Sequence, residues 1–157
     1  MKQVDTQSYI SMLRELVEQG HDVSLLISGN SMLPFLIHNR DTIYFRQPER
    51  PLQVGDMVFY QRLDGDYIMH RICRITDEGI FTVGDAQQLI EGPLAPEQIF
   101  ARITAVRRKG KLVKPGNFWW EFFEHIWIRL IPWRHGIMKL YGVNFQPRKG
   151  ENHDTEK

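Results

Sequence analysis

The chain has 157 residues, of which 42% are hydrophobic and 25% charged, and this composition is typical of one globular domain with a short appendage. Its 20 lysines and arginines stand against 19 aspartates and glutamates, so the net charge of +1 gives no electrostatic reason to expect a nucleic-acid partner. The only cysteine, Cys73, excludes an intramolecular disulfide and a cysteine-rich metal site.

Residues 1–21 predict an amphipathic helix. Apolar residues recur with the spacing of one helical face, at Tyr9, Ile10, Leu13, Leu16 and Val17. Gly20 provides a stop. The segment lacks both the apolar core of a signal peptide and the roughly 20 apolar residues of a spanning helix. We therefore expect neither, and a membrane-peripheral and a cytoplasmic location both stay open.

Residues 22–115 predict a mainly β domain. Short runs rich in β-branched and aromatic residues alternate with Gly, Asp and Pro, as in strands joined by short turns. The runs are DVSLLIS, DTIYFRQ, DMVFYQR, DYIMHRICRIT, GIFTVGD and QIFARITAVRR. Six or more such strands favour an antiparallel sandwich or partly open barrel. The stretch RRKGKLVKPGN, residues 107–117 at the end of this domain, is interpreted as a connector to the next segment.

Residues 116–142 predict an aromatic amphipathic helix that Pro132 ends. Its polar side holds Glu121, Glu124, His125 and Arg129, and its apolar side holds Trp119, Phe122, Phe123, Ile126 and Leu130. One interpretation is a helix that covers an exposed face of the β domain. The other is an interfacial membrane helix over residues 117–133, favoured by its tryptophans and by basic residues such as Arg134 and Lys139. Residues 143–157 predict a polar tail.

The stretch SGNSMLPFL, residues 28–36, contains the candidate nucleophile. A serine in a turn is a poor nucleophile unless a base accepts its proton and donors stabilise the oxyanion, and most such serines are polar surface residues. Here Gly29 permits a tight backbone approach before Ser31, and Pro34 stiffens the chain after it. The candidate base, His70, lies on the predicted strand YIMHRI.

The candidate base and acid are ambiguous when each is taken alone. Strand alternation puts His70 on the face of Ile68 and Ile72, where a histidine is commonly a satisfied core residue. The stretch VGDAQQLIE then places Asp85 in a Gly-Asp turn and Glu91 six residues later. Either carboxylate could orient an imidazole, although each is also typical of a turn or surface acid. The residues themselves leave the choice open.

Together these motifs resemble the type I signal peptidase family of serine proteases. SGNSMLPFL, VGDMVFYQ, MHRI, TVGDAQ and ARITAV occur in family order over residues 22–108, and these later boxes make the central pattern G-x-S-M-x-P more specific. The resemblance implies a fold of the signal peptidase type, with the serine of the Ser-Met pair, Ser31, as nucleophile. The base of the family is lysine in the common bacterial branch and histidine in the archaeal and endoplasmic-reticulum branch, at the position of His70.

The lysine content favours the histidine branch. No lysine lies between Lys2 and Lys109, so a Ser-Lys dyad inside the β domain has no candidate. Two further histidines, His21 in the predicted helix-to-strand turn and His38 in the loop after the serine motif, are interpreted as surface residues.

The resemblance also implies acyl transfer without a metal or a cofactor. Ser31 would attack a peptide carbonyl, and His70 would take its proton and later activate the water that releases the acyl-enzyme. The remaining site residues are expected among the acids Asp85 and Glu91 and the oxyanion donors Ser28, Asn30 and Ser31. The expected substrate is an extended protein or peptide segment, such as a signal or leader peptide, docked as an added strand and cut after small residues.

Two departures and two alternatives accompany this resemblance. Family members usually carry a spanning helix, which is not expected here, and HNRD stands where the family usually has a Gly-Asp turn. The related self-cleaving repressors share the fold, but they use a lysine base and carry a DNA-binding domain before the serine, whereas only 30 residues precede Ser31. A non-catalytic peptide-binding or scaffold domain would keep the fold without turnover. The presence of serine, histidine and acid argues against it.

Overall fold

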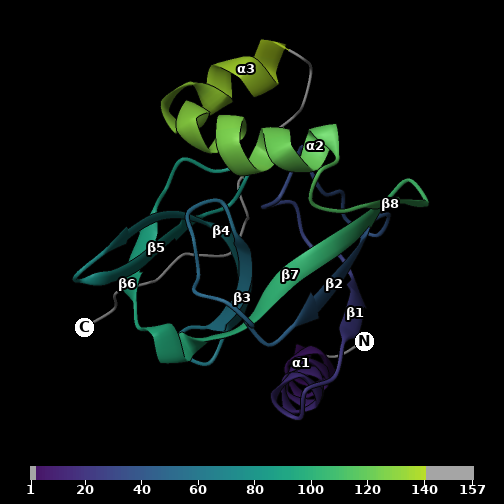
Figure 1. Cartoon of the computed structure of the whole chain (residues 1–157). Helices are drawn as coiled ribbons and strands as arrows, with labels where there is room; N and C mark the ends of the chain where they lie inside the picture. Colours follow the sequence, from purple (N-terminus) through teal and green to yellow (C-terminus); the bar gives the residue numbers. More distant parts are fainter. Residues whose placement is uncertain (1–2, 141–157) are drawn as a thin grey trace.

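One antiparallel sheet forms the centre of the molecule (Figure 1). The computed structural model describes residues 3–140. Within them the strands are β1 (Val23–Leu26), β2 (Thr42–Arg46), β3 (Met57–Gln61), β4 (Tyr67–Thr76), β5 (Gly79–Val83), β6 (Glu91–Leu94), β7 (Ile99–Arg108) and β8 (Lys111–Val113). They are ordered β1-β2-β7-β3-β4-β5-β6, with β8 paired to β7, and the sheet does not close. The predicted class, a mainly β antiparallel fold with an N-terminal and a C-terminal helical element, is confirmed.

Six of these strands lie in the six predicted runs, and two strands were not predicted. The strand β6 contains Gly92 and Pro93, which strands usually avoid except at an edge or bulge. The strand β8 corrects the interpretation of residues 107–117 as a plain connector. Arg108 and Lys111 are opposite each other, so β7 and β8 form a hairpin with a two-residue turn. Both turn residues, Lys109 and Gly110, have the positive φ angles that such a hairpin requires.

Two apolar cores lie on the two faces of the sheet, because strand residues alternate between the faces. The larger core lies between the sheet and the helices, and it includes Leu13, Val17, Phe45, Phe59, Trp120, Phe123 and Trp127. The smaller core includes Val58, Tyr60, Ile68, Ile72, Ile80, Leu94 and Ile99. Figure 1 shows α1 at one end of the sheet and the C-terminal helices at the other.

The N-terminal helix agrees with its prediction. It is α1 (Gln3–Glu18), and its inner face buries Ile10, Leu13 and Val17. Gly20 ends it with a φ of 89°, a conformation that glycine adopts without strain. The N–H groups of Gly20 and His21 donate to the carbonyls of Val17 and Leu16, which is the usual way to satisfy the last carbonyls of a helix.

The C-terminal helical segment, residues 118–140, contains helical stretches that meet at a kink just before Pro132. It consists of α2 (Phe118–Glu121), the π-helical turn η2 (Phe122–Ile126), the 3-10 helix η3 (Trp127–Trp133) and α3 (Arg134–Leu140). The first stretch ends at Leu130, whose φ of −98° and ψ of 15° are not helical, two residues before the proline that was predicted to end it. Pro132 then lies in the first turn of the next stretch, where a helix needs no backbone N–H donor.

The buried face of this segment also differs from the predicted wheel. Trp120, Phe123 and Trp127 are buried, whereas Trp119 and Ile126, expected on the apolar side, are about half exposed. The wheel assumed a regular α-helical repeat, and the π and 3-10 turns depart from it. The ring of Phe123 contacts that of Phe35 at 4.7 Å between centroids. The segment therefore covers the β domain, as the first interpretation expects.

The remaining expectations concern the membrane and the boundaries. Among residues 3–140, no helix has the length and apolar character needed to cross a bilayer. The predicted polar tail, residues 143–157, lies outside the described residues. The division of the chain at residues 21, 115 and 142 stays a prediction.

Candidate active site

Ser31 lies in a turn between β1 and β2 that is tied to the connection after β5. Its backbone carbonyl accepts a hydrogen bond from the Ala86 N–H at 2.9 Å. In the same turn the Gly29 N–H donates to Nδ1 of His38 at 2.7 Å, which joins His38 to the serine motif. His38 is exposed, as expected. Met32 is buried in the larger core. The turn is therefore held on both sides of Ser31, whose side chain stays partly exposed.

Gly84 gives Ser31 room beside the strand that carries His70. Across the β4–β5 pair, Arg71 is opposite Val83. This is the last pair of the ladder, and the next residues beyond it are His70 on β4 and Gly84 after the end of β5. A Cβ atom at Gly84 would lie only 2.6 Å from the Ser31 carbonyl oxygen. The Ser31 backbone thus occupies the space of the missing Gly84 side chain, at the end of the β4–β5 pair that adjoins His70.

His70 is buried on β4 beside a tyrosine hydroxyl. The Tyr60 hydroxyl oxygen lies 3.4 Å from His70 Nδ1 and 3.1 Å from Thr82 Oγ1. The same hydroxyl donates to Glu91 Oε2 at 2.7 Å. Tyr60 therefore stands between the imidazole and the Glu91 carboxylate.

The environment holds Tyr60 protonated and Glu91 ionised. Burial, the largest effect, raises the pKa of Tyr60, so its hydroxyl remains a donor at neutral pH. Burial would also raise the pKa of Glu91, but hydrogen bonds from Arg62 and Tyr60, and then the charges of Arg62 and His70, lower it overall. Arg62 donates to the two carboxylate oxygens through Nε at 2.7 Å and Nη2 at 3.0 Å.

Asp85, the other candidate acid, is engaged with Arg71. Its two oxygens accept hydrogen bonds from Arg71 Nε at 2.9 Å and Nη2 at 3.0 Å, and both side chains are buried. Arg71 also donates to the Gly55 carbonyl. Because Arg71 and His70 are adjacent on one strand, their side chains point to opposite faces. The structure thus brings Glu91, through Tyr60, to His70, whereas Asp85 is bound to Arg71 on the other face.

The predicted oxyanion donors surround an open turn. Ser28 and Asn30 are exposed. In the described part of the chain, the backbone N–H groups of Asn30 and Ser31 find no acceptor, and the Ser31 hydroxyl makes no hydrogen bond. A Ser31–His70 hydrogen bond is therefore not formed in this structure, and their joint catalytic role stays a prediction. Catalytic hydrogen bonds often tighten only when substrate is bound.

The C-terminal helical segment binds the turn after β5, residues 84–87, whose Ala86 N–H in turn binds the Ser31 carbonyl. The indole N–H of Trp127 donates to the Asp85 carbonyl at 2.8 Å. Arg134 Nη1 donates to the carbonyls of Gly84 at 2.9 Å and Gln87 at 3.1 Å. Burial, the main effect, lowers the pKa of Arg134 to about 10, which leaves it charged at neutral pH. This turn is therefore fixed to the Ser31 carbonyl on one side and to the helical segment on the other.

Sequence reasoning missed several residues of this arrangement. They are Tyr60, Arg62, Thr82, Trp127 and Arg134, together with the structural role of Arg71. Arg71 follows His70 in the motif MHRI, which was a usable signal. The others depend on strand register and on helix packing, which no local pattern reports. Arg134, which the membrane interpretation of this segment placed near a lipid surface, is fully buried.

Two other features hold none of the predicted catalytic residues. Glu121, Glu124 and His125 offer metal-ligand atoms within 4.8 Å of one another, the one such group among residues 3–140. His125 Nε2 lies 3.0 Å from the Glu121 carboxylate and 3.5 Å from that of Glu124. A cavity of about 290 Å³ lies over β2 and β7, away from Ser31 and His70.

Comparison with known proteins gives one match. The Peptidase S24-like family matches residues 1–84, more than half of the chain. The matched span contains Ser31 and His70, and it ends before Asp85 and Glu91. It supports a peptidase fold without singling out the type I signal peptidases. No curated protein and no solved structure matches the chain. The chain belongs to the Peptidase S24-like family.

Proposed function

We propose that this chain is a serine endopeptidase in which Ser31 attacks a peptide carbonyl and His70 accepts its proton. The observation that carries the proposal is the position of the Ser31 backbone against Gly84, at the end of the β4–β5 ladder that adjoins His70. The family match over both residues supports the same assignment. We propose that the enzyme is of the signal peptidase type with a histidine base, because the motifs around Ser31 and His70 resemble that branch of the family.

Glu91 and Tyr60 serve as the groups that orient His70. The Tyr60 hydroxyl donates its proton to Glu91, so its oxygen can accept the Nδ1 proton of His70. This fixes the tautomer in which Nε2 is the free base. Asp85 has a structural role instead, because Arg71 occupies both of its oxygens.

The reaction then follows acyl transfer in two stages. His70 Nε2 takes the Ser31 proton as Oγ bonds to the carbonyl carbon, and the backbone N–H groups of Asn30 and Ser31 stabilise the oxyanion. The imidazolium protonates the leaving amine as the peptide bond breaks. A water then attacks the acyl-enzyme, giving its proton to His70, and Ser31 is released with its hydroxyl restored.

The substrate class is an extended segment with a small residue before the cleaved bond, such as a signal or leader peptide. This assignment rests on the resemblance to the signal peptidases. The edge strand β1, which pairs only with β2 in the described part of the chain, leads into the Ser31 turn and offers a free edge for strand addition.

Active-site labelling tests the proposal. A fluorophosphonate probe should label the purified protein, and Ser31→Ala should abolish labelling. Ser24→Ala, a change at an exposed serine of β1, is the matched control and should leave labelling intact. Labelling that survives Ser31→Ala would refute the nucleophile. If the native chain is not labelled and cleaves no small-residue peptide, the peptide-binding or scaffold alternative is favoured, since the family includes non-catalytic members.

A further inference from the structure

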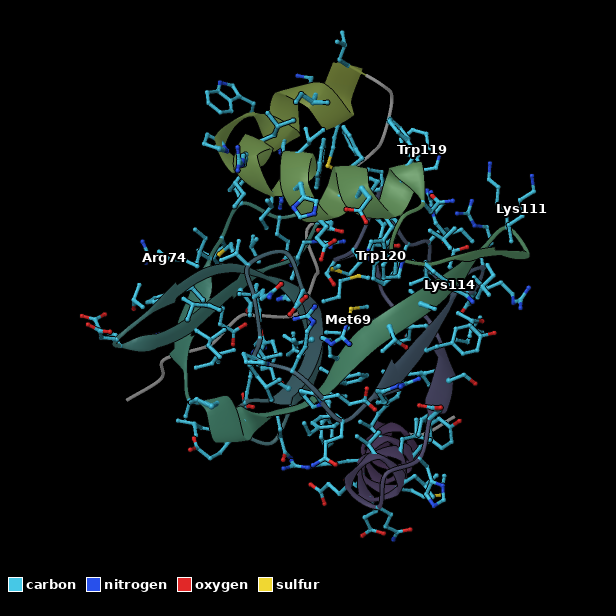
Figure 2. The ribbon with its side chains drawn as sticks, viewed as in Figure 1. Met69, Arg74, Lys111, Lys114, Trp119 and Trp120 are labelled. Atoms are coloured by element: carbon cyan, nitrogen blue, oxygen red, sulfur yellow. The ribbon has the colours of Figure 1, made fainter. Side chains whose placement is uncertain are left out.

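Lysines and exposed aromatic rings gather at one corner of the molecule (Figure 2). Residues 3–140 contain four lysines, and three of them lie between positions 109 and 114. All three are exposed. Beside them, at the start of α2, Phe118 is 68% exposed and Trp119 is 49% exposed. We call this surface, formed by Lys109, Lys111, Lys114, Phe118 and Trp119, the lysine–aromatic corner.

Backbone and side-chain contacts hold the corner together. Arg108 is opposite Lys111 in the β7–β8 hairpin, and its guanidinium lies 5.9 Å from the centre of the Trp119 ring. The Asn117 N–H donates to the Lys114 carbonyl at 3.0 Å. The Asn117 side chain accepts from the Trp119 N–H at 2.9 Å and so caps α2. The lysine hairpin and the aromatic helix start are therefore fixed to each other.

The rings at this corner form one apolar surface. Phe118 contacts Trp119 at 5.1 Å and Phe122 at 6.2 Å between ring centres. An amphipathic aromatic such as tryptophan favours the boundary between headgroups and acyl chains, and clustered lysines attract anionic headgroups. A nucleic-acid partner is less well matched, because the net charge of the chain is only +1.

We propose that the lysine–aromatic corner docks the protein on a bilayer that contains anionic lipids. The charge of the three lysines is complementary to the headgroups, and Phe118 and Trp119 enter the interface. The site shares only Phe118 and Trp119 with the interfacial helix over residues 117–133 that the sequence suggested. Three rings of that helix are buried on the β domain, those of Trp120, Phe123 and Trp127. The site does not depend on peptidase activity.

Vesicle sedimentation of the full chain tests the charge requirement. The protein should sediment with phosphatidylcholine vesicles only when they also contain phosphatidylserine, and high salt should release it. Lys111→Gln and Lys114→Gln should each lower the partition coefficient about fivefold. Arg74→Gln, on the opposite side of the molecule in Figure 2, should leave it unchanged. Equal binding to uncharged vesicles, or an equal loss with Arg74→Gln, would overturn the proposal.

A pair of exposed tryptophans tests the apolar contact. Trp119→Ala should lower the partition coefficient roughly tenfold, because the ring no longer enters the interface. Trp133→Ala removes a ring that is 62% exposed in the same helical segment but outside the corner, and it should have little effect. Both variants are first checked for native thermal unfolding. Equal losses in the two variants, no vesicle binding at all, or preferred binding to a nucleic-acid duplex would each refute the assignment.

Discussion

Gly84 and Glu91, two residues with no direct part in bond breaking, determine whether the proposed catalytic pair can work. Gly84 leaves the space that the Ser31 carbonyl occupies, and Glu91 reaches His70 through the Tyr60 hydroxyl. Gly84 directly follows β5, the strand paired with the one that carries His70, and Glu91 is the first residue of β6. Two variants therefore test the site at the scale of residues: one fills the space at Gly84, and the other removes the charge of Glu91.

The steric test is Gly84→Ala. The added methyl would lie 2.6 Å from the Ser31 carbonyl, so the Ser31 turn must shift and lose its alignment with His70. We expect kcat/KM to fall roughly 100-fold, because a displacement of about 1 Å has an effect of that size. Gly136→Ala, in α3 with nothing within 4 Å, is the control and should leave kcat/KM unchanged. Full activity in Gly84→Ala would contradict the placement of Ser31.

The electrostatic test is the pH dependence of stability in Glu91→Gln. The pKa of Glu91 is lowered in the folded chain, because hydrogen bonds from Arg62 and Tyr60 outweigh burial. Its contribution is therefore fully present above the ordinary value of 4.5 and is lost as pH falls through the lower folded value.

Urea unfolding at a series of pH values measures this contribution. The difference in free energy of unfolding between the native chain and Glu91→Gln should be constant near neutrality and should shrink below about pH 4.5. Glu78→Gln, in the exposed turn between β4 and β5, is the control. A difference that stays the same down to pH 3 would show that the ionised carboxylate makes no such contribution.

At the scale of elements, the C-terminal helical segment is part of the domain. Trp120, Phe123 and Trp127 belong to the larger core, and Trp127 and Arg134 bind the turn after β5 that contacts the Ser31 backbone. Deleting residues 117–142 should therefore unfold the β domain rather than release an independent helix. The first two residues of the segment, Phe118 and Trp119, are nevertheless exposed and form part of the lysine–aromatic corner.

Two phenylalanines of this segment provide a matched stability test. Phe123 is 3% exposed and Phe118 is 68% exposed. Phe123→Ala should lower the free energy of unfolding by about 3 to 5 kcal/mol, because it leaves a cavity in the core. Phe118→Ala should change it by no more than about 0.5 kcal/mol. Thermal and urea unfolding measure both, and equal effects would mean that the segment does not pack as described.

At the scale of the whole molecule, local patterns predict the elements and not their partners. Alternation and turn residues were enough to find six strands and both helical elements, because these signals lie within each segment. The β3–β4 register that sets Val58 opposite His70, and so brings Tyr60 to the imidazole, joins distant segments and has no local signal. Likewise, only the contacts in the folded chain show that Glu91 lies near His70, through Tyr60, and that Asp85 binds Arg71 instead.

The kinetics of Ser31→Ala, His70→Ala and the double variant test the central claim most directly. Residues that act as one catalytic unit give non-additive losses. Each single variant should lower kcat for a small-residue peptide by about 10⁴-fold or more, and the double variant should be little worse than either. Each variant should retain native thermal unfolding. Losses that multiply in the double variant, or activity that survives Ser31→Ala, would contradict a Ser31–His70 mechanism.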